Sequence, residues 1–166
     1  MKSIFYIVFT FLFLSINSWS QQVYHENITQ ESGLPNETVY DIYKDSKGYI
    51  WFTTDEGLVR YNGYNYKVYK NELGLSVSGT YIKEDFKGRI WYQTFDGILF
   101  YVENDFLKCH STKNNLGFKP YFFDQHHLIK TSGNNIEKTD LRTQKSIQKQ
   151  FDETIQFSQI INHIIV

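Results

Sequence analysis

The chain has 166 residues, the size of one ordinary domain, and its 17 basic and 18 acidic residues leave a net charge of −1. This balance provides no basic face, so we expect no nucleic-acid partner for this segment. The one cysteine, Cys109, has no second cysteine for an internal disulfide, and we interpret it as a small hydrophobic residue in a strand. Aromatic residues make up 18% of the chain, and because they favour strands they indicate an all-β fold.

Residues 1–20 have the pattern of a secretory signal peptide. Lys2 supplies a positive charge, residues 4–16 are almost all apolar, and Ser18 and Ser20 are small residues where a signal peptidase reads the chain. A membrane anchor is the alternative, but this run is shorter than the roughly 20 residues that span a bilayer. We therefore predict cleavage after Ser20 and an exported, periplasmic mature chain over residues 21–166.

The next elements along the chain are short strands separated by tight turns. Residues 39–44 (VYDIYK) alternate apolar and polar side chains, which is typical of a half-buried strand. Residues 45–48 (DSKG) then form a turn, because Asp can bond the nearby backbone and Gly accepts a positive φ. Residues 49–54 (YIWFTT) are apolar and β-branched, and this run is long enough for a buried strand and too short for a helix.

Two more strands complete this unit. Residues 55–57 (DEG) turn the chain, residues 58–61 return, and Asn62-Gly63 is a strong hairpin signal. Residues 64–69 (YNYKVY) alternate again. The unit is therefore predicted to be a sheet of four antiparallel strands.

The unit is repeated. Residues 45–61 and 85–101 share eight identities at seventeen aligned positions, at an offset of 40 and without a gap. The identical pairs are Asp45 and Asp85, Lys47 and Lys87, Gly48 and Gly88, Ile50 and Ile90, Trp51 and Trp91, Thr54 and Thr94, Gly57 and Gly97, and Tyr61 and Tyr101. Four strands in about 40 residues is the size of one β-propeller blade. We therefore predict an all-β fold built of propeller blades.

A third copy is much weaker. Ile129, Asn135 and Ile136 fall near the places of a tryptophan, a glycine and an isoleucine of the second copy, but the offset slips to 38 and the tryptophan is absent. A third blade and an unrelated segment both remain open at this point.

The repeats are assigned to residues 33–72, 73–112 and, in degenerate form, 113–150, with the start of a further strand in 151–166. A closed propeller needs roughly four to eight blades. Two clear blades and a third degenerate copy would leave an incomplete ring, so we expect the chain to be a truncated N-terminal piece of a longer protein.

The repeated residues have structural interpretations. The repeated glycines are placed where the backbone reverses. Trp51 and Trp91 are expected to pack between adjacent blades, the alternative being stacking platforms for a ligand. Asp45 and Asp85 are interpreted as turn formers rather than metal ligands.

The sequence contains no recognisable catalytic motif. Serine nucleophile elbows, phosphate-binding loops and paired zinc-type cysteines are absent. His126 and His127 are adjacent, so on a strand they would point to opposite faces and could not share a metal ion. We therefore expect no enzyme, no metal and no cofactor. A propeller-type polysaccharide lyase or hydrolase fragment is the enzymatic alternative.

Residues 33–39 (GLPNETV), followed by D-x-K-G-x-I-W-F-x-T-x-x-G-L-x-R-Y-N-G, resemble the repeat of two-component regulator propellers. The resemblance covers residues 22–102 well. The second copy departs from the pattern at residues 73–76 (LGLS) and at Val102-Glu103. In that family a secreted many-bladed propeller sensor precedes a tyrosine-rich β-sandwich, a membrane span and usually a histidine kinase.

The resemblance implies an extracytoplasmic ligand-sensing segment that lacks the membrane span and the kinase. It implies a carbohydrate or another small extracellular ligand, and as partners the remaining blades and downstream domains of a sensor whose relatives are membrane-anchored and dimeric. Tyr49, Tyr64 and Tyr66 are candidate ligand contacts, with packing on a strand face as the alternative. A structural or protein-binding propeller remnant is the competing function.

Overall fold

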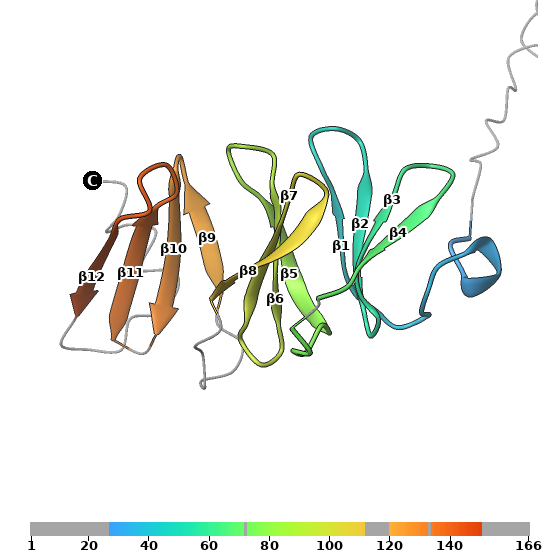
Figure 1. Cartoon of the computed structure of the whole chain (residues 1–166), viewed down its shortest axis with the longest axis horizontal. Coiled ribbons are helices and arrows are strands. Elements are labelled where there is room, and N and C mark those ends of the chain that lie inside the picture. The colour runs from blue at the N-terminus through green and yellow to red at the C-terminus, as the bar shows by residue number, and fades with distance from the viewer. Residues whose placement is uncertain (1–26, 72, 112–119, 133, 151–166) are drawn as a thin grey trace, which may run out of the picture.

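A computed structural model of the chain describes residues 27–71, 73–111, 120–132 and 134–150. The predicted signal peptide (1–20) and the further strand expected in 151–166 lie outside these ranges. The described residues form three four-stranded antiparallel sheets that follow one another along the molecule (Figure 1). None of their helices is long and apolar enough to span a membrane.

Sheet 1 has the strands that the first repeat predicts. A short 3-10 helix, η2 (Gln30–Ser32), precedes it. Its strands are β1 (Val39–Lys44), β2 (Ile50–Thr54), β3 (Gly57–Tyr61) and β4 (Tyr66–Tyr69). They pair in chain order, each with the next. The four predicted strands are confirmed, with ends that differ by at most two residues.

Sheets 2 and 3 repeat this arrangement. Sheet 2 contains β5 (Gly79–Glu84), β6 (Ile90–Thr94), β7 (Leu99–Glu103) and β8 (Phe106–Ser111). Sheet 3 contains β9 (Tyr121–Asp124), β10 (His127–Ser132), β11 (Asn135–Asp140) and β12 (Ser146–Gln150). The degenerate third repeat therefore forms a complete sheet. Ile129 on β10 and Ile136 on β11 are 0% and 6% exposed, so apolar side chains support this sheet without a tryptophan.

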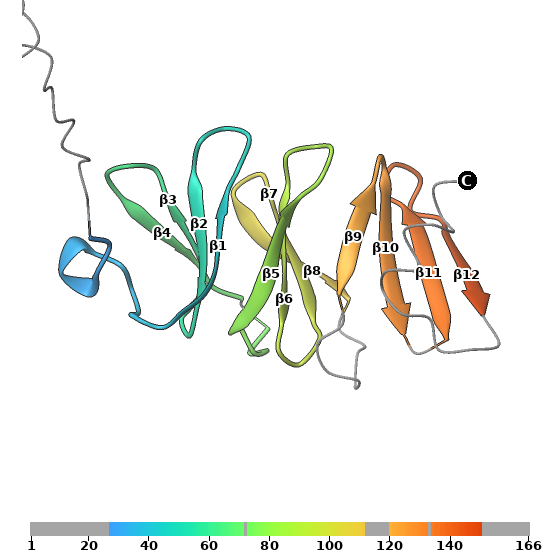
Figure 2. The ribbon, with the colours of Figure 1, turned by 180° about the vertical axis from the view of Figure 1, so that it is seen from behind.

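The first strands of neighbouring sheets connect the sheets to one another. The backbone N–H of Ile82 on β5 donates to Oδ2 of Asp41 on β1 at 2.7 Å, and the Tyr121 hydroxyl on β9 donates to the Tyr81 carbonyl on β5 at 2.7 Å. The β1–β2, β5–β6 and β9–β10 turns lie at one end of the sheets, and the β2–β3 and β6–β7 turns lie at the other (Figures 1 and 2). Consecutive sheets are thus stacked as propeller blades are.

Each space between two sheets holds one tryptophan. At the first junction, between sheets 1 and 2, Trp51 packs in a core with Leu58, Tyr69, Tyr92 and Phe100. The second junction, between sheets 2 and 3, has its own core of Trp91, Leu99, Tyr121, Leu128 and Leu141. Leu34 of the N-terminal segment covers the other face of sheet 1 together with Phe52, Val59 and Tyr61. Both tryptophans therefore lie where the repeat predicts them.

The ungapped alignment of the two repeats is wrong by one residue after the second turn. Trp51 pairs with Arg60 in sheet 1, whereas Trp91 pairs with Tyr101 in sheet 2. A constant offset of 40 would place Phe100 there. Tyr101 is consequently the counterpart of Arg60 and not of Tyr61, although the letters of the two tyrosines align.

The reason is a longer turn in sheet 2. In sheet 1 Thr54 pairs directly with Gly57 across a two-residue turn. In sheet 2 the chain reaches one residue further, because the Thr94 N–H donates to the Ile98 carbonyl at 2.9 Å. Side chains alternate between faces along a strand, so one extra residue moves every later side chain to the opposite face.

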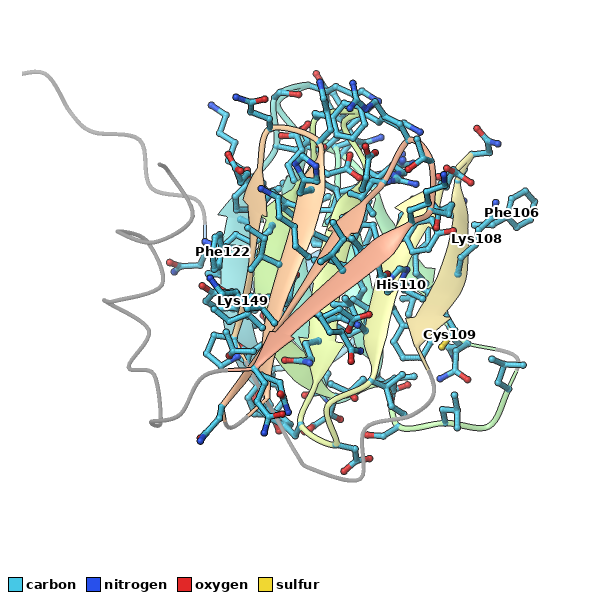
Figure 3. The ribbon with its side chains drawn as sticks, turned by 90° about the vertical axis from the view of Figure 1, so that its left-hand side faces the viewer. Phe106, Lys108, Cys109, His110, Phe122 and Lys149 are labelled. Carbon is cyan, nitrogen blue, oxygen red and sulfur yellow. The ribbon has the colours of Figure 1, made fainter. Side chains whose placement is uncertain are left out.

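The same shift, followed by a register irregularity between β7 and β8, changes the place of Cys109. The offset of 40 would place Cys109 at the position of Tyr69, but Cys109 pairs with Phe100 and packs, half-buried, against the core of the first junction. His110, the next residue along β8 (Figure 3), meets Trp91 edge to face at 5.1 Å. Tyr69 contacts Trp51 of its own sheet with its ring stacked at 5.4 Å, so His110 and not Cys109 takes the place of Tyr69 beside the tryptophan.

Candidate functional site

The repeated D-x-K-G turn holds the tryptophan of its own sheet. Oδ1 of Asp45 accepts the backbone N–H groups of Lys47 at 3.0 Å and Tyr49 at 2.8 Å, and Oδ2 accepts Nε1–H of Trp51 at 2.7 Å. The aspartate is buried, yet three donors satisfy its two oxygens. The carboxylate therefore fixes both the turn and the indole ring.

Asp85 makes the same three bonds in sheet 2. It accepts the backbone N–H groups of Lys87 at 2.9 Å and Arg89 at 3.0 Å, and the Trp91 indole N–H at 2.8 Å. It also receives Nε–H of Arg89 at 2.7 Å. The described residues contain no group of three or more His, Cys, Asp or Glu side chains that could hold a metal ion.

The remaining repeated residues shape the turns. Gly48, Gly57, Gly88 and Gly97 have φ values of 90°, 112°, 72° and 88°. Thr54 and Thr94 bond backbone atoms of the β2–β3 and β6–β7 turns through their hydroxyl groups. These residues position the strands. The β2–β3 and β6–β7 turns lie at one end of the first junction, and a polar surface lies at its other end, beside the D-x-K-G turns.

A cleft of about 600 Å³ opens at that end, between sheets 1 and 2. The β1–β2, β5–β6 and β7–β8 turns border it, and we call it the first-junction cleft. Lys47, Tyr49, Arg60, Lys87, Arg89 and Asp105 are among the residues that line it. Its volume is in the range of pockets that bind small molecules.

Asp105 in the β7–β8 turn clamps the two sheets together at this cleft. It accepts from Nη1 of Arg60 at 3.0 Å, from the Tyr69 hydroxyl at 2.6 Å and from the Lys67 ammonium. The hydrogen bond from Lys67 and then that from Tyr69 lower the pKa of the Asp105 carboxyl. Burial, followed by the bond to Asp105, raises the pKa of Tyr69. One carboxylate of sheet 2 thus binds three donors of sheet 1.

Arg89 forms a second ionic cluster on sheet 2. Its Nη1 donates to Glu103 at 3.2 Å, and Lys108 donates to the same carboxylate at 2.6 Å. The bond from Lys108 is the main cause that lowers the pKa of Glu103, with the Arg89 bond contributing in the same direction. The Arg89 guanidinium also lies over the rings of Trp91 and Tyr101.

Sequence reasoning did not find Arg60, Arg89 or Asp105. Arg89 stands where the first repeat has Tyr49, and the register shift separates Arg60 from its counterpart, so neither arginine recurs at the offset of the repeat. Their juxtaposition with acidic groups of another strand or sheet is a tertiary property. The only available signal was Arg60 as a charged residue inside an otherwise apolar strand, because Arg89 precedes β6 and Asp105 lies in a turn.

The structure does not bring the three candidate tyrosines together. Tyr49 lines the first-junction cleft, and the Arg60 guanidinium lies 4.9 Å from the centre of its ring. Tyr64 is 89% exposed in the β3–β4 turn. Tyr66 stacks on Tyr61 at 4.6 Å and packs on the other face of sheet 1. Of the three, Tyr49 alone lies in the cleft.

The described histidines lie in packed surroundings. Burial, and then the positive charge of Lys130, lowers the pKa of His110 to about 4. The ring of His126 packs edge to face on Phe86 at 4.5 Å. Within the described ranges, the Nδ1 atoms of His126 and His127 are buried without a hydrogen-bond partner.

Parts of the chain resemble a known protein family and a known protein. Residues 33–56 match the family model described as a two component regulator propeller. The chain is 32% identical over 65 residues to histidine kinase P4 of Formosa agariphila. That alignment covers 39% of this chain and 5% of the relative, so the chain spans a small part of that protein.

Solved structures share the fold. The extracellular domains of two putative hybrid two component systems from B. thetaiotaomicron superpose with TM-scores of 0.62 and 0.60 at 16% and 19% identity. These superpositions cover 83% and 75% of this chain but 19% and 20% of those domains. Virginiamycin B lyase from Staphylococcus aureus superposes with a TM-score of 0.55 at 19% identity, over 72% of this chain and 44% of the lyase. At such identities the likeness establishes the fold alone.

The three stacked sheets and these superpositions define a segment of a β-propeller with three successive blades. The match of residues 33–56 to the two component regulator propeller model confirms the resemblance seen in the sequence for that part of the chain.

Proposed function

We propose that the chain belongs to the ligand-sensing propeller of an extracytoplasmic two-component sensor. The observation that carries this proposal is the combination of the regulator-propeller repeat at residues 33–56 with the fold of extracellular two-component domains. Further blades, the membrane span and the histidine kinase would belong to the rest of such a sensor. The shares of 19% and 20% that the chain covers of the solved domains are consistent with this assignment.

The first-junction cleft is the part of the segment best suited to a ligand. It lies between two blades, and Asp105 and Glu84 bridge these blades beside it. A ligand that binds better to one spacing of the blades would shift their relative position, which is how binding can be coupled to a distant output. A carbohydrate or another small extracellular molecule fits the volume of the cleft, with Tyr49 as a stacking surface.

The segment itself is proposed to be non-catalytic. Asp45, Asp85 and Asp105 are bonded to structural donors, and no motif for nucleotide binding accompanies them. The likeness to virginiamycin B lyase concerns the fold and carries no catalytic residue to this chain. We expect the purified chain to turn over neither ATP nor polysaccharide; activity above that of a heat-inactivated sample would contradict this expectation.

Two measurements test the sensor assignment. Mass spectrometry of the periplasmic fraction should find a mature N-terminus at Gln21, whereas an intact Met1 on cytoplasmic protein would contradict export. Deletion of the gene should abolish a transcriptional response to an extracellular carbohydrate, and complementation should restore it. If no carbohydrate response depends on the gene, the structural or protein-binding alternative is favoured.

A further inference from the structure

The acidic groups at the first-junction cleft are already bonded to donors of the chain. Asp45 accepts from two backbone N–H groups and an indole, and Asp105 accepts from Arg60, Lys67 and Tyr69. Glu103 accepts from Arg89 and Lys108. Asp105 and Glu103 are therefore paired with positive side chains, and both oxygens of the buried Asp45 are occupied by neutral donors.

Two lysines at the cleft form no ion pair with a described carboxylate. Lys47 and Lys87 occupy the same position of the two D-x-K-G turns, and only their backbone N–H groups take part in the turns. No described carboxylate lies within ion-pairing distance of either ammonium group. The structural roles of Asp45, Gly48 and Trp51 explain their repetition. The Lys87 ammonium lies over the exposed ring of Phe86 at 5.5 Å, a contact that leaves its positive charge without a paired carboxylate.

The lysine-bearing turns are held next to each other across the junction. The backbone N–H of Ser46 and its hydroxyl both donate to the Glu84 carboxylate, at 2.8 Å and 2.5 Å. The Lys47 ammonium reaches sheet 2, where it lies about 4.0 Å from the place that a Cβ on Gly88 would occupy. Positive side chains of two blades thus line one cleft.

Arg60 adds a directional donor to this cleft. Its guanidinium uses one N–H group, on Nη1, for Asp105, and the side chain remains 26% exposed. The rings of Tyr49, Trp51 and Tyr69 lie beside it at 4.9 Å, 5.8 Å and 5.8 Å. An arginine fixed by aromatic rings presents its remaining N–H groups in the planar arrangement that suits a carboxylate or a sulfate.

We propose that the first-junction cleft binds an anionic group, a carboxylate or sulfate, through Lys47, Lys87 and Arg60. The cleft volume of about 600 Å³ accommodates a saccharide that carries such a group, with Tyr49 against the sugar ring. The identity of the ligand as an acidic saccharide rests on the proposed sensor function. Recognition of the anion rests only on the charges and contacts of the cleft.

Isothermal titration calorimetry of the chain at low ionic strength tests this proposal. The probes are glucuronate, its neutral counterpart glucose, and inorganic sulfate. We expect glucuronate to bind at least about tenfold more tightly than glucose, because three positive groups act on one charge. Sulfate binding as tight as that of glucuronate would also support the anion site. It would show that the anion binds without a sugar ring.

Matched variants identify the binding groups. Lys47→Met with Lys87→Met keeps the aliphatic stems and should weaken glucuronate binding about tenfold, and Lys47→Glu with Lys87→Glu should abolish it. Lys70→Met, an exposed lysine that does not line the cleft, should change nothing. Circular dichroism confirms that each variant is folded.

Glucuronate binding no tighter than glucose, or unchanged in the double methionine variant, would overturn the proposal. The gene-deletion experiment tests the sensor function separately. If it fails, the calorimetric evidence for an anion site is unaffected.

Discussion

The first and third blades reach the same architecture by different means. In sheet 1 the D-x-K-G turn separates Lys44 from its partner Ile50, and Asp45 inside that turn holds Trp51. In sheet 3 Asp124 pairs directly with His127 across a two-residue turn, and the buried position on β10 is taken by Ile129. The short turn has no room for an aspartate that bonds back to its own strand. Sheet 3 therefore shows that buried apolar residues are sufficient for a blade, whereas the aspartate and tryptophan pair strengthens the two blades that carry it.

Replacing Trp51 with Ala should break the first junction most severely. The side chain is 3% exposed and belongs to a core shared by two sheets, so its truncation should lower the free energy of unfolding by about 3–5 kcal/mol. Denaturant titration measures the change, with the exposed Tyr64→Ala as a control that should be neutral. Retained stability together with a lost ligand response would identify Trp51 as a binding platform instead.

Asp45→Ala tests whether the turn aspartate stabilises sheet 1. It leaves the buried Trp51 indole N–H and two backbone N–H groups without their acceptor, so we expect a loss of about 2–3 kcal/mol in unfolding free energy. Asp124→Ala in sheet 3 removes only an ion pair with Lys138 at 3.3 Å and should cost less than about 1 kcal/mol. Equal losses from the two substitutions would show that the blades do not differ in this respect.

Lowering the pH should destabilise the second junction more than the first. The pKa of His110 is lowered in the folded protein, so the unfolded chain binds the proton first as the pH falls. The contribution of neutral His110 to stability is complete above about pH 6.5 and is lost between about pH 6.5 and 4, at a cost of about 3 kcal/mol. His110→Tyr gives the second junction the residue type of the first, where Tyr69 does not titrate in this range. Denaturation between pH 7 and pH 4 should show a flatter pH dependence for this variant, and an unchanged profile would refute the assignment.

The Asp105 clamp should give the smallest effect. Its lowered pKa means that its contribution is present above the unfolded value near 3.8 and is lost as the pH falls through the lower folded value. Because the carboxylate is 49% exposed, solvent and salt screen it, and Asp105→Asn should reduce stability by less than about 1 kcal/mol at pH 7. The difference between variant and wild type should shrink further in 1 M salt. An effect independent of salt would indicate that packing, not charge, fixes the β7–β8 turn.

Local patterns were sufficient to predict the strands of sheet 1. The alternation in residues 39–44 and the apolar run around Trp51 depend only on neighbours in the chain, and the repeat at an offset of 40 extended the prediction to sheet 2. The degenerate third copy was weaker because its buried strand has no tryptophan and its first turn is shorter. Apolar positions alone leave the register of such a copy undetermined.

The cleft could not be predicted in the same way. Asp105 meets Arg60, Lys67 and Tyr69 because the last turn of sheet 2 lies against the last strands of sheet 1, and none of these pairs is close in sequence. The one-residue shift after Thr94 also hides the correct alignment. Tyr61 and Tyr101 are identical residues at the repeat offset, but the strand pairing shows that they are not equivalent. Of the three candidate tyrosines only Tyr49 lies in the cleft, and residue type alone does not distinguish it from Tyr64 and Tyr66.

The longer β6–β7 turn indicates where a blade of this kind tolerates inserted residues. Strand β7 begins Leu99-Phe100-Tyr101-Val102, with four apolar or aromatic residues in succession, so it buries suitable side chains on both faces in either register. Strand β3 has Arg60 in its interior, and a one-residue shift there would turn that charge toward the apolar face of sheet 1. Sheet 2 can therefore accept insertions in its β6–β7 turn with little rearrangement of its core. That turn is the place where new loop sequence could be grafted onto this propeller at the lowest cost in folding.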